Sequence, residues 1–201
     1  MRLPLLIPVV ILLPALASKS GENQNSESGR NPPSAPRNFD SLLQQCLPQG
    51  ARIIYSAKEK SGGSVPDGRF SAVDKDGRQL LAGTYKKGVL DGELITFHPS
   101  GRLSSRELYD NGKLISTAVD WDSNGRIVRT ANYDRGEKEG LETYWLGSGD
   151  VRLQILWKAT SPEWIAFYES GVVVKKLSGD GALQYFRQKA LDDVKPATKG
   201  K

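Results

Sequence analysis

Two residues, His98 and Cys46, are the sole members of their types among 201, and they limit the chemistry available to this chain. A nucleophile–histidine relay needs a histidine beside an activated serine or cysteine. His98 instead stands in a Phe97-His98-Pro99 turn with no nucleophile motif around it. One Cys and one His also fall short of the four ligands of a structural zinc site. We therefore expect a protein that is not an enzyme, with no catalytic, metal or cofactor site. A pair of carboxylates that meet in space stays open as catalytic machinery.

The charge pattern argues against a nucleic-acid partner. The chain carries 28 Lys and Arg against 23 Asp and Glu, a net charge of +5, and the two signs are interspersed. Its like-charge pairs in the repeated region, Lys86-Lys87 and Lys175-Lys176, are too short to follow a phosphate backbone. The single Cys46 excludes an intrachain disulfide and leaves an intermolecular one open.

An aromatic side chain recurs every 12 residues through the middle of the chain. The series comprises Tyr85, Phe97, Tyr109, Trp121, Tyr133, Trp145 and Trp157. Twelve residues accommodate one strand of about seven residues and a tight turn. The series predicts a regular array of strands, and its seven aromatic side chains form a candidate binding face.

Glycines recur in the same frame at intervals of 24 residues and mark the turns. One set is Gly77, Gly101, Gly125 and Gly149, and the other is Gly88, Gly112 and Gly136. Each follows residues that initiate turns, as Asp110-Asn111 precedes Gly112, and hairpin turns need a positive φ at such positions. The pattern predicts antiparallel hairpins joined by two alternating kinds of turn.

The even length of the half-unit predicts how side chains divide between the two faces. Because 12 is even, we expect odd-numbered strand residues to share one face through the whole array. Odd positions such as Val119 and Ile155 are mostly apolar, whereas even positions such as Arg106, Asp120 and Glu142 are mostly polar. We therefore expect one apolar face and one wet face, which is an antiparallel arrangement.

The two ends of the chain differ from the repeated region. Met1-Arg2, an apolar run and Ala15-Leu16-Ala17 predict a signal peptide cleaved after Ala17, and hence a periplasmic or secreted protein. We divide the chain into a signal peptide (1–17), a disordered linker (18–38), an N-terminal helix and strand cap (39–67), a repeat domain (68–179), a C-terminal helix (180–194) and a disordered tail (195–201). The expected fold is mainly β, a single-layer antiparallel meander with short flanking helices.

The segment from Gly83 to Leu103, with Gly88, Gly92 and Gly101 around Tyr85 and Phe97, resembles the MORN repeat in its bacterial variant form. The segment from Asn132 to Trp145 resembles it again, and the likeness extends over about residues 68–177. This variant occurs in YwqK-type proteins labelled antitoxins, so the resemblance implies a protein that neutralises a toxin by binding it. The chain departs from the motif where Ser116 replaces a glycine and where the unit after Trp157 lacks its Gly motif.

The sequence leads to one preferred function and two alternatives. We expect an exported, non-catalytic repeat scaffold that binds another protein through the surface of its sheet, because large exposed apolar faces mark interaction sites. The first alternative is a binder of cell-envelope glycan or anionic lipid headgroups at a membrane surface, and the second is the antitoxin role implied by the resemblance. The partner and the oligomeric state are unknown from sequence.

Overall fold

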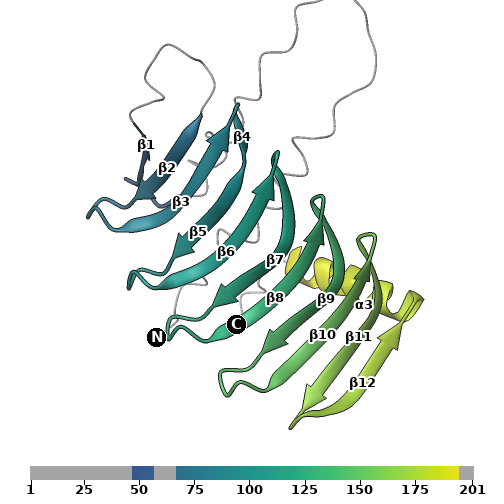
Figure 1. The fold of residues 1–201 in the computed structure, drawn as a ribbon. Coiled ribbons are helices and arrows are strands. Elements are labelled where there is room, and N and C mark those ends of the chain that lie inside the picture. The colour runs from purple at the N-terminus through teal and green to yellow at the C-terminus, as the bar shows by residue number, and fades with distance from the viewer. Residues whose placement is uncertain (1–46, 57–66, 195–201) are drawn as a thin grey trace, which may run out of the picture.

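The computed structural model describes residues 47–56 and 67–194, with side chains up to residue 188. The predicted signal peptide (1–17), the linker (18–38), residues 39–46 and 57–66 of the predicted N-terminal cap (39–67) and the tail (195–201) lie outside these ranges. Within the described residues the protein is mainly β: one antiparallel sheet of twelve strands that follow one another in sequence order, except that β4 and β5 both pair with β3. Figure 1 shows the strands side by side in a single layer. The meander predicted from the repeats is confirmed.

The elements have the following bounds. They are β1 (Arg52–Tyr55), β2 (Gly68–Val73), β3 (Gln79–Lys86), β4 (Val89–Leu90), β5 (Gly92–Phe97), β6 (Leu103–Asp110), β7 (Lys113–Trp121), β8 (Ile127–Asp134), β9 (Glu137–Trp145), β10 (Val151–Lys158), β11 (Ser161–Glu169), β12 (Val172–Ser178) and α3 (Asp180–Val194). β4 pairs with β3, off the main path, and β1 and β12 are the two edge strands. No described helix is long and apolar enough to cross a bilayer.

The strands are joined along one margin by two-residue turns with a repeated left-handed conformation. Asn111 and Gly112 have φ of 48° and 78°, and Lys87-Gly88, Arg135-Gly136 and Ser170-Gly171 are alike. Two positive φ values in succession define the type I′ turn, whose twist matches that of the strands. Ala159 and Thr160 hold the same conformation, at 46° and 66°, without a glycine. The repeat's turn therefore persists after Trp157, where its sequence signature is lost.

Longer turns join the strands along the opposite margin, and the second set of glycines ends them. The backbone N–H of Gly125 donates to the carbonyl of Asp122 at 2.9 Å, and the turns that end in Gly77, Gly101 and Gly149 close in the same way. The Asp122 carboxylate also accepts from the N–H groups of Asn124 and Arg126, which lowers its pKa. The glycines in these turns have φ between 80° and 95°. All seven predicted turn glycines thus lie in turns at positive φ.

The structure contradicts the expectation that odd-numbered residues share one face. Lys113 pairs with Asp110, three positions away, and a β-bulge beside each longer turn makes Thr96 pair with Ser105, nine positions away. Both differences are odd, so the buried face changes parity at every turn and returns only after 24 residues. The even-numbered Asp120 therefore lies across the strands from the odd-numbered Ser105.

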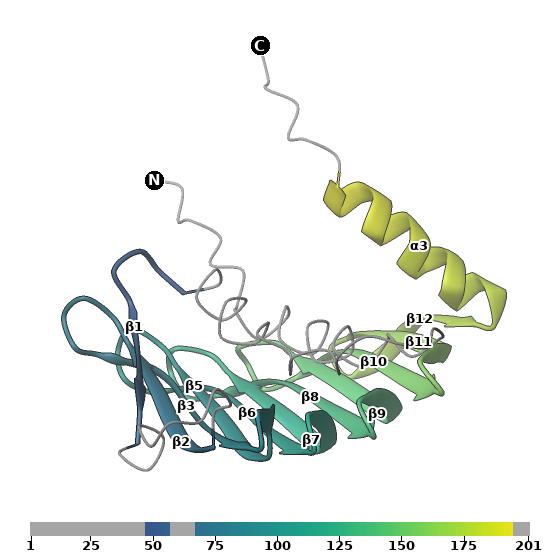
Figure 2. The ribbon, with the colours of Figure 1, turned by 90° about the horizontal axis from the view of Figure 1, so that it is seen from above.

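We call the face that carries buried Tyr85, Tyr109 and Tyr133 the inner face. Its N-terminal half is an apolar cluster that includes Phe70, Leu81 and Leu94, with the rings of Phe70 and Tyr85 stacked at 4.4 Å. Its C-terminal end packs against α3, where the centroid distances are 5.3 Å for Trp157–Phe186 and 5.4 Å for Phe167–Tyr185. Figure 2 shows α3 on one side of the sheet at its β11–β12 end.

We call residues at equivalent positions of successive 24-residue units a column of the repeat. Each aromatic residue in the column of Tyr85, Tyr109, Tyr133 and Trp157 lies opposite a residue with positive φ. Tyr85 pairs with Gly68, Tyr109 with Gly92 and Trp157 with Gly140, and these glycines have φ of 114°, 108° and 82°. An aromatic ring beside a strand glycine covers the backbone that the glycine leaves bare. In the third unit Tyr133 faces Ser116, which adopts φ of 63° with a side chain in place.

Candidate binding surfaces

The seven aromatic residues predicted to form one binding face lie in two different places. Tyr85, Tyr109 and Tyr133 are at most 8% exposed on the inner face, and Trp157 lies in the same column. Phe97, Trp121 and Trp145 end β5, β7 and β9, one residue beyond the inner-face positions Thr96, Asp120 and Tyr144. Because successive strand residues point to opposite sides, these three do not share a face with the tyrosines. The prediction of a single aromatic face was therefore wrong, because residues pair an odd number of positions apart across each turn.

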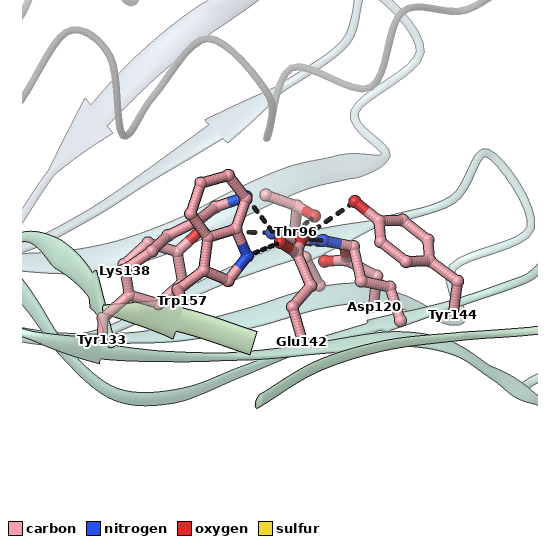
Figure 3. Close-up of polar contacts among 9 residues, drawn as sticks. Thr96, Asp120, Tyr133, Lys138, Glu142, Tyr144 and Trp157 are labelled. Atoms are coloured by element: carbon pink, nitrogen blue, oxygen red, sulfur yellow. Dashed lines mark hydrogen bonds and ion pairs between the residues drawn. The ribbon is translucent and has the colours of Figure 1, made fainter. Parts of the chain in front are cut away.

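The inner face instead brings together a cluster of ionised and hydroxyl groups around Glu142, which is fully buried (Figure 3). One carboxylate oxygen accepts from Arg129 Nε at 2.7 Å and from the Tyr144 hydroxyl at 2.8 Å. The other accepts from Lys138 Nζ at 2.7 Å and from Trp157 Nε1 at 2.6 Å. Burial alone would raise the pKa of Glu142, but the two cations outweigh it and lower the pKa. Glu142 is thus an ionised, fully bonded group inside the fold.

Arg129 extends the cluster to two neighbouring strands. Its guanidinium donates to Asp120 Oδ2 at 3.0 Å and to the Tyr133 hydroxyl at 3.1 Å, in addition to Glu142. The second oxygen of Asp120, Oδ1, is buried and accepts no hydrogen bond. Burial raises the pKa of Asp120, and Arg129 opposes this rise. We call Asp120, Arg129, Lys138 and Glu142, with the Tyr133, Tyr144 and Trp157 side chains that they contact, the polar cluster.

A further buried carboxyl, Glu107, lies on β6 beside this cluster. It is 2% exposed, and the Tyr109 hydroxyl donates to its Oε2 at 2.8 Å. Burial raises the pKa of Glu107 to about 7, because a charged carboxylate loses more solvation than the hydroxyl bond restores. Glu107 therefore titrates near neutral pH inside the sheet.

Sequence reasoning placed Asp120 and Glu142 on the wet face, and the repeat frame holds the signal that it missed. Glu142 follows Leu94 and Ala118 at intervals of 24 residues, and both of those residues are buried. Lys138 follows Leu90 and Leu114 in the same way. Charged residues in columns that are otherwise apolar mark a polar site within the core. Only the alignment of whole 24-residue units, and not the 12-residue parity, would have revealed it.

The polar cluster is bonded within itself, which determines what it can do. Its cations, the Tyr144 hydroxyl and the Trp157 N–H are paired with its carboxylates, and the Tyr133 hydroxyl accepts from Arg129. Within the described residues no three His, Cys, Asp or Glu side chains meet as a metal site. A groove of about 610 Å³ lies elsewhere, between β1, β2, β3 and β5, with Ile54, Tyr55 and Ile95 in its lining. Such a self-paired network fixes the register of the strands that it joins.

The three aromatic residues outside the inner face form a second candidate surface, along the margin of the longer turns. Cross-strand pairs recur there at 24-residue intervals: Phe97–Leu103, Trp121–Ile127 and Trp145–Val151. Leu103, Ile127 and the adjacent Leu146 are 42%, 45% and 44% exposed. We call these seven residues the aromatic margin; in Figure 1 it follows the turns β5–β6, β7–β8 and β9–β10.

Hydrogen bonds between neighbouring turns hold the aromatic margin in place. His98 Nε2 lies 2.9 Å from the carbonyl of Trp121, one unit further along the chain. Arg102 donates to the carbonyl of Ser123 at 3.3 Å, and Arg126 donates to that of Gly147 in the next turn. His98 therefore links two neighbouring turns by a hydrogen bond, and such links hold the apolar pairs in fixed positions relative to one another.

Comparisons with known proteins add little to this geometry. No family model matches the chain, and no curated protein matches it. Solved structures that resemble it include TarM of S. aureus (11% identity, TM-score 0.37), the Gap123 glycosylation-associated complex of Streptococcus agalactiae (14%, 0.35) and a GtfA/B complex bound to UDP and GlcNAc (13%, 0.28). The matches cover 91%, 90% and 73% of this chain but only 29%, 29% and 28% of those chains. At these TM-scores the likeness carries no argument about function.

Proposed function

We propose that this protein is a non-catalytic repeat scaffold that binds another protein through its aromatic margin. The observation that carries the proposal is the recurrence of one apolar pair three times at a fixed interval, with the aliphatic member of two pairs more than two-fifths exposed. Scattered exposed apolar residues are common, whereas a contiguous repeated stripe marks an interaction site. The export signal predicted at residues 1–17 supports a role outside the cytoplasm.

The polar cluster supports the same proposal by its contrast with the margin. Both oxygens of Glu142 are already bonded to donors of the cluster, so a ligand that bound Glu142 would have to break these hydrogen bonds. Binding at the aromatic margin breaks no hydrogen bond of this kind, because burial of Leu103, Ile127 and Leu146 requires only the removal of water. A partner therefore gains free energy at the margin at about 25 cal/mol per Å² of apolar surface covered.

Affinity capture with matched variants tests this proposal. The margin variant carries Leu103→Ser, Ile127→Ser and Leu146→Ser, and the control variant carries Leu108→Ser, Val172→Ser and Val174→Ser, three exposed residues elsewhere on the sheet. We expect the wild type and the control to retain the same protein from the native envelope fraction, and the margin variant to lose it. Equal retention by all three folded proteins would refute the margin as the binding surface.

Export is tested separately, by the mass of the mature chain in its native source. We expect the purified protein to begin at Ser18 and to be found outside the cytoplasm. A chain that keeps residues 1–17 and fractionates with the cytoplasm would contradict export and leave the binding proposal to be judged by the capture experiment.

A further inference from the structure

We propose that a groove at the β1–β5 end of the sheet binds a small monocarboxylic acid with an aliphatic body. The groove shares no residue with the aromatic margin, so this inference goes beyond the proposed function and is tested independently of it. Three features carry it: a groove of defined size, a row of side chains that forms an apolar trough, and an adjacent row with an excess of positive charge.

The groove has a volume of about 610 Å³ and lies over β1, β2, β3 and β5. Sites for small molecules commonly have volumes of roughly 300–1,000 Å³. The groove is on the side of the sheet opposite to the inner face, which we call the outer face. Its lining residue Ile54 is 49% exposed, whereas the preceding Ile53 packs against the apolar cluster of the inner face. By the same alternation Ser71, which precedes the buried Ala72, points to the outer face.

One row of cross-strand neighbours forms the apolar part of the groove. Its members pair in succession from β1 to β5, and they are Ile54, Ser71, Ala82 and Ile95. The two isoleucines extend further from the backbone than the serine and the alanine between them, so they form the walls of a trough. An aliphatic group placed between these walls removes apolar surface from water on both sides.

The repeat shows that this trough belongs to the first unit alone. In the column of Ser71 the next two units carry Ile95 and Val119, and in the column of Ala82 the next unit carries Arg106. Larger side chains therefore occupy the equivalent surface further along the sheet. The small side chains of β2 and β3 leave a space that the residues of the later units would fill.

A second row, beside the first, carries polar side chains. Arg69 pairs with Thr84, and the backbone N–H of Ser56 donates to the carbonyl of Arg69 at 2.9 Å, so two hydroxyl-bearing residues flank the arginine. All three line the groove. A guanidinium can bind a carboxylate through two parallel hydrogen bonds, and hydroxyls can donate to the same group. This row therefore supplies donors for a carboxylate next to the trough.

The charges of this row favour a ligand with a single negative charge. Glu93, which also lines the groove, accepts from Arg106 Nε at 2.9 Å and forms an ion pair with that arginine. Because Glu93 is neutralised in this way, the excess charge is the single positive charge of Arg69. A carboxylate balances that charge, whereas a phosphate group, at about −1.5 to −2, exceeds it.

The aromatic residues of the lining do not offer a stacking surface for a saccharide. Tyr55 and Phe70 pack in the apolar cluster of the inner face, with their ring centroids 6.5 Å apart. A ligand in the groove therefore meets isoleucine side chains, hydroxyls and a guanidinium. A peptide laid along the trough would bring backbone polar groups that need partners, whereas an aliphatic chain brings none.

Methyl NMR of the full chain tests the inference, with hexanoate as the probe. Labelled isoleucine methyl groups report the groove through Ile54 and Ile95 and the far end of the sheet through Ile155 and Ile165. We expect saturable shifts of the first two and none of the other two. Acetate, which lacks the aliphatic body, and hexanol, which lacks the charge, should leave all four unchanged, and hexyl phosphate should bind more weakly than hexanoate.

Two further probes identify the source of the carboxylate. They are the tripeptide glycyl-glycyl-leucine and its C-terminal amide. If the peptide acid binds and the amide does not, a chain terminus can supply the carboxylate. If hexanoate binds and neither peptide does, the ligand is a free acid. Both results support a site for an aliphatic carboxylate.

Matched variants test the two rows separately. Ser71→Ile installs the residue of the next unit and fills the trough, so we expect it to abolish binding, whereas Val119→Ile, in the same column, should leave it unchanged. Arg69→Gln removes the charge, and we expect it to weaken binding about tenfold or more. Arg152→Gln, at an exposed arginine of β10, is its control. The isoleucine methyl spectrum shows whether each variant is folded.

Three results would overturn the inference. The first is the absence of saturable shifts at Ile54 and Ile95 at high millimolar hexanoate. The second is binding of hexanol or hexyl phosphate as tight as that of hexanoate, which would refute the carboxylate. The third is unchanged binding in folded Ser71→Ile, which would place the ligand outside the groove.

Discussion

The polar cluster and the aromatic margin are built on the same repeat, and they use it in opposite ways. At the cluster, four donors converge on the two oxygens of Glu142, and the side chain is fully buried. At the margin, the Trp121 and Trp145 indoles and the aliphatic side chains beside them make no polar bond within the described residues. The repeat determines the course of the backbone. The residue type at each repeat position then determines whether a side chain is bonded inside the fold or remains exposed for a partner.

The largest expected effect comes from breaking the polar cluster at its centre. Glu142→Leu restores the residue found at position 94 but leaves the half-buried Lys138 without its carboxylate and Arg129 with Asp120 as its remaining carboxylate partner. We expect the free energy of unfolding to fall by about 3–5 kcal/mol, because an uncompensated buried charge costs more than its pair contributed. Urea denaturation followed by circular dichroism measures the change.

A compensated variant sharpens this prediction. Glu142→Leu combined with Arg129→Leu, Lys138→Leu and Asp120→Thr gives all four columns the residue of the first repeats, Leu94, Leu81, Leu90 and Thr96. We expect most of the lost stability to return, since a whole ionic cluster replaced by apolar residues of similar volume is often neutral. A variant no more stable than Glu142→Leu alone would show that the cluster has become indispensable to the register of β7 to β10.

The second effect is a pH dependence that arises at Glu107. Its pKa of about 7 in the folded chain exceeds the ordinary value of 4.5, so the folded state keeps a proton that the unfolded state releases between these values. The contribution of Glu107 to the free energy of unfolding is therefore complete below pH 4.5 and is lost as pH rises through 7, by up to about 3 kcal/mol. Denaturation from pH 4.5 to 8 should show this loss in the wild type and a smaller one in Glu107→Gln. Parallel curves for the two proteins would contradict it.

The third effect comes from strain in the Ala159-Thr160 turn. Both residues hold positive φ where the equivalent positions are Asn111 and Gly112, and a β-branched residue is poorly suited to this conformation. We expect Ala159→Asn with Thr160→Gly to raise the free energy of unfolding by about 1 kcal/mol. The reciprocal change, Asn111→Ala with Gly112→Thr, should lower it by a similar amount. If thermal melting shows no difference in either direction, the turns do not carry this strain.

The fold was predictable because its signals are local and repeated. The spacing of Gly101, Gly125 and Gly149 predicts turns, and the aromatic period predicts strands. The faces were not predictable from the same counting, because residues pair an odd number of positions apart across both kinds of turn, and each such pairing reverses the parity. At the two-residue turns this follows from the loop length, as for Asp110 with Lys113, whereas at the longer turns it depends on a bulge that no residue type marks; Asp120 and Glu142 were therefore assigned to the wrong side.

The sequence predicted the aromatic members of the aromatic margin but not its exposed aliphatic members. Phe97, Trp121 and Trp145 belong to the predicted series, but their separation from Tyr109 and Tyr133 depends on the odd-numbered pairing across both kinds of turn. Their aliphatic partners Leu103 and Ile127 also recur at 24 residues, yet strand residues of this kind are ordinarily buried. Only the structure reveals that these two remain more than two-fifths exposed.

The smallest expected effect on stability is at the margin itself. Leu103→Ser, Ile127→Ser and Leu146→Ser remove apolar surface that is already largely in water, so each should change the free energy of unfolding by at most about 0.5 kcal/mol. The same variant should abolish partner capture. A loss of stability comparable to that of Glu142→Leu would mean that these residues belong to the core, and the contrast between the two regions would disappear.

Hydroxyl-radical footprinting of the native complex tests the margin most directly, because it reads side-chain access in the unaltered chain. Oxidation of Trp121, Trp145, Leu103 and Ile127 is compared with and without the captured partner, with the exposed Leu108 and Val172 as internal references. We expect protection of the first four residues and unchanged oxidation of the two references. Protection of Val172 or Leu108, with the margin as reactive as in the free chain, would contradict it.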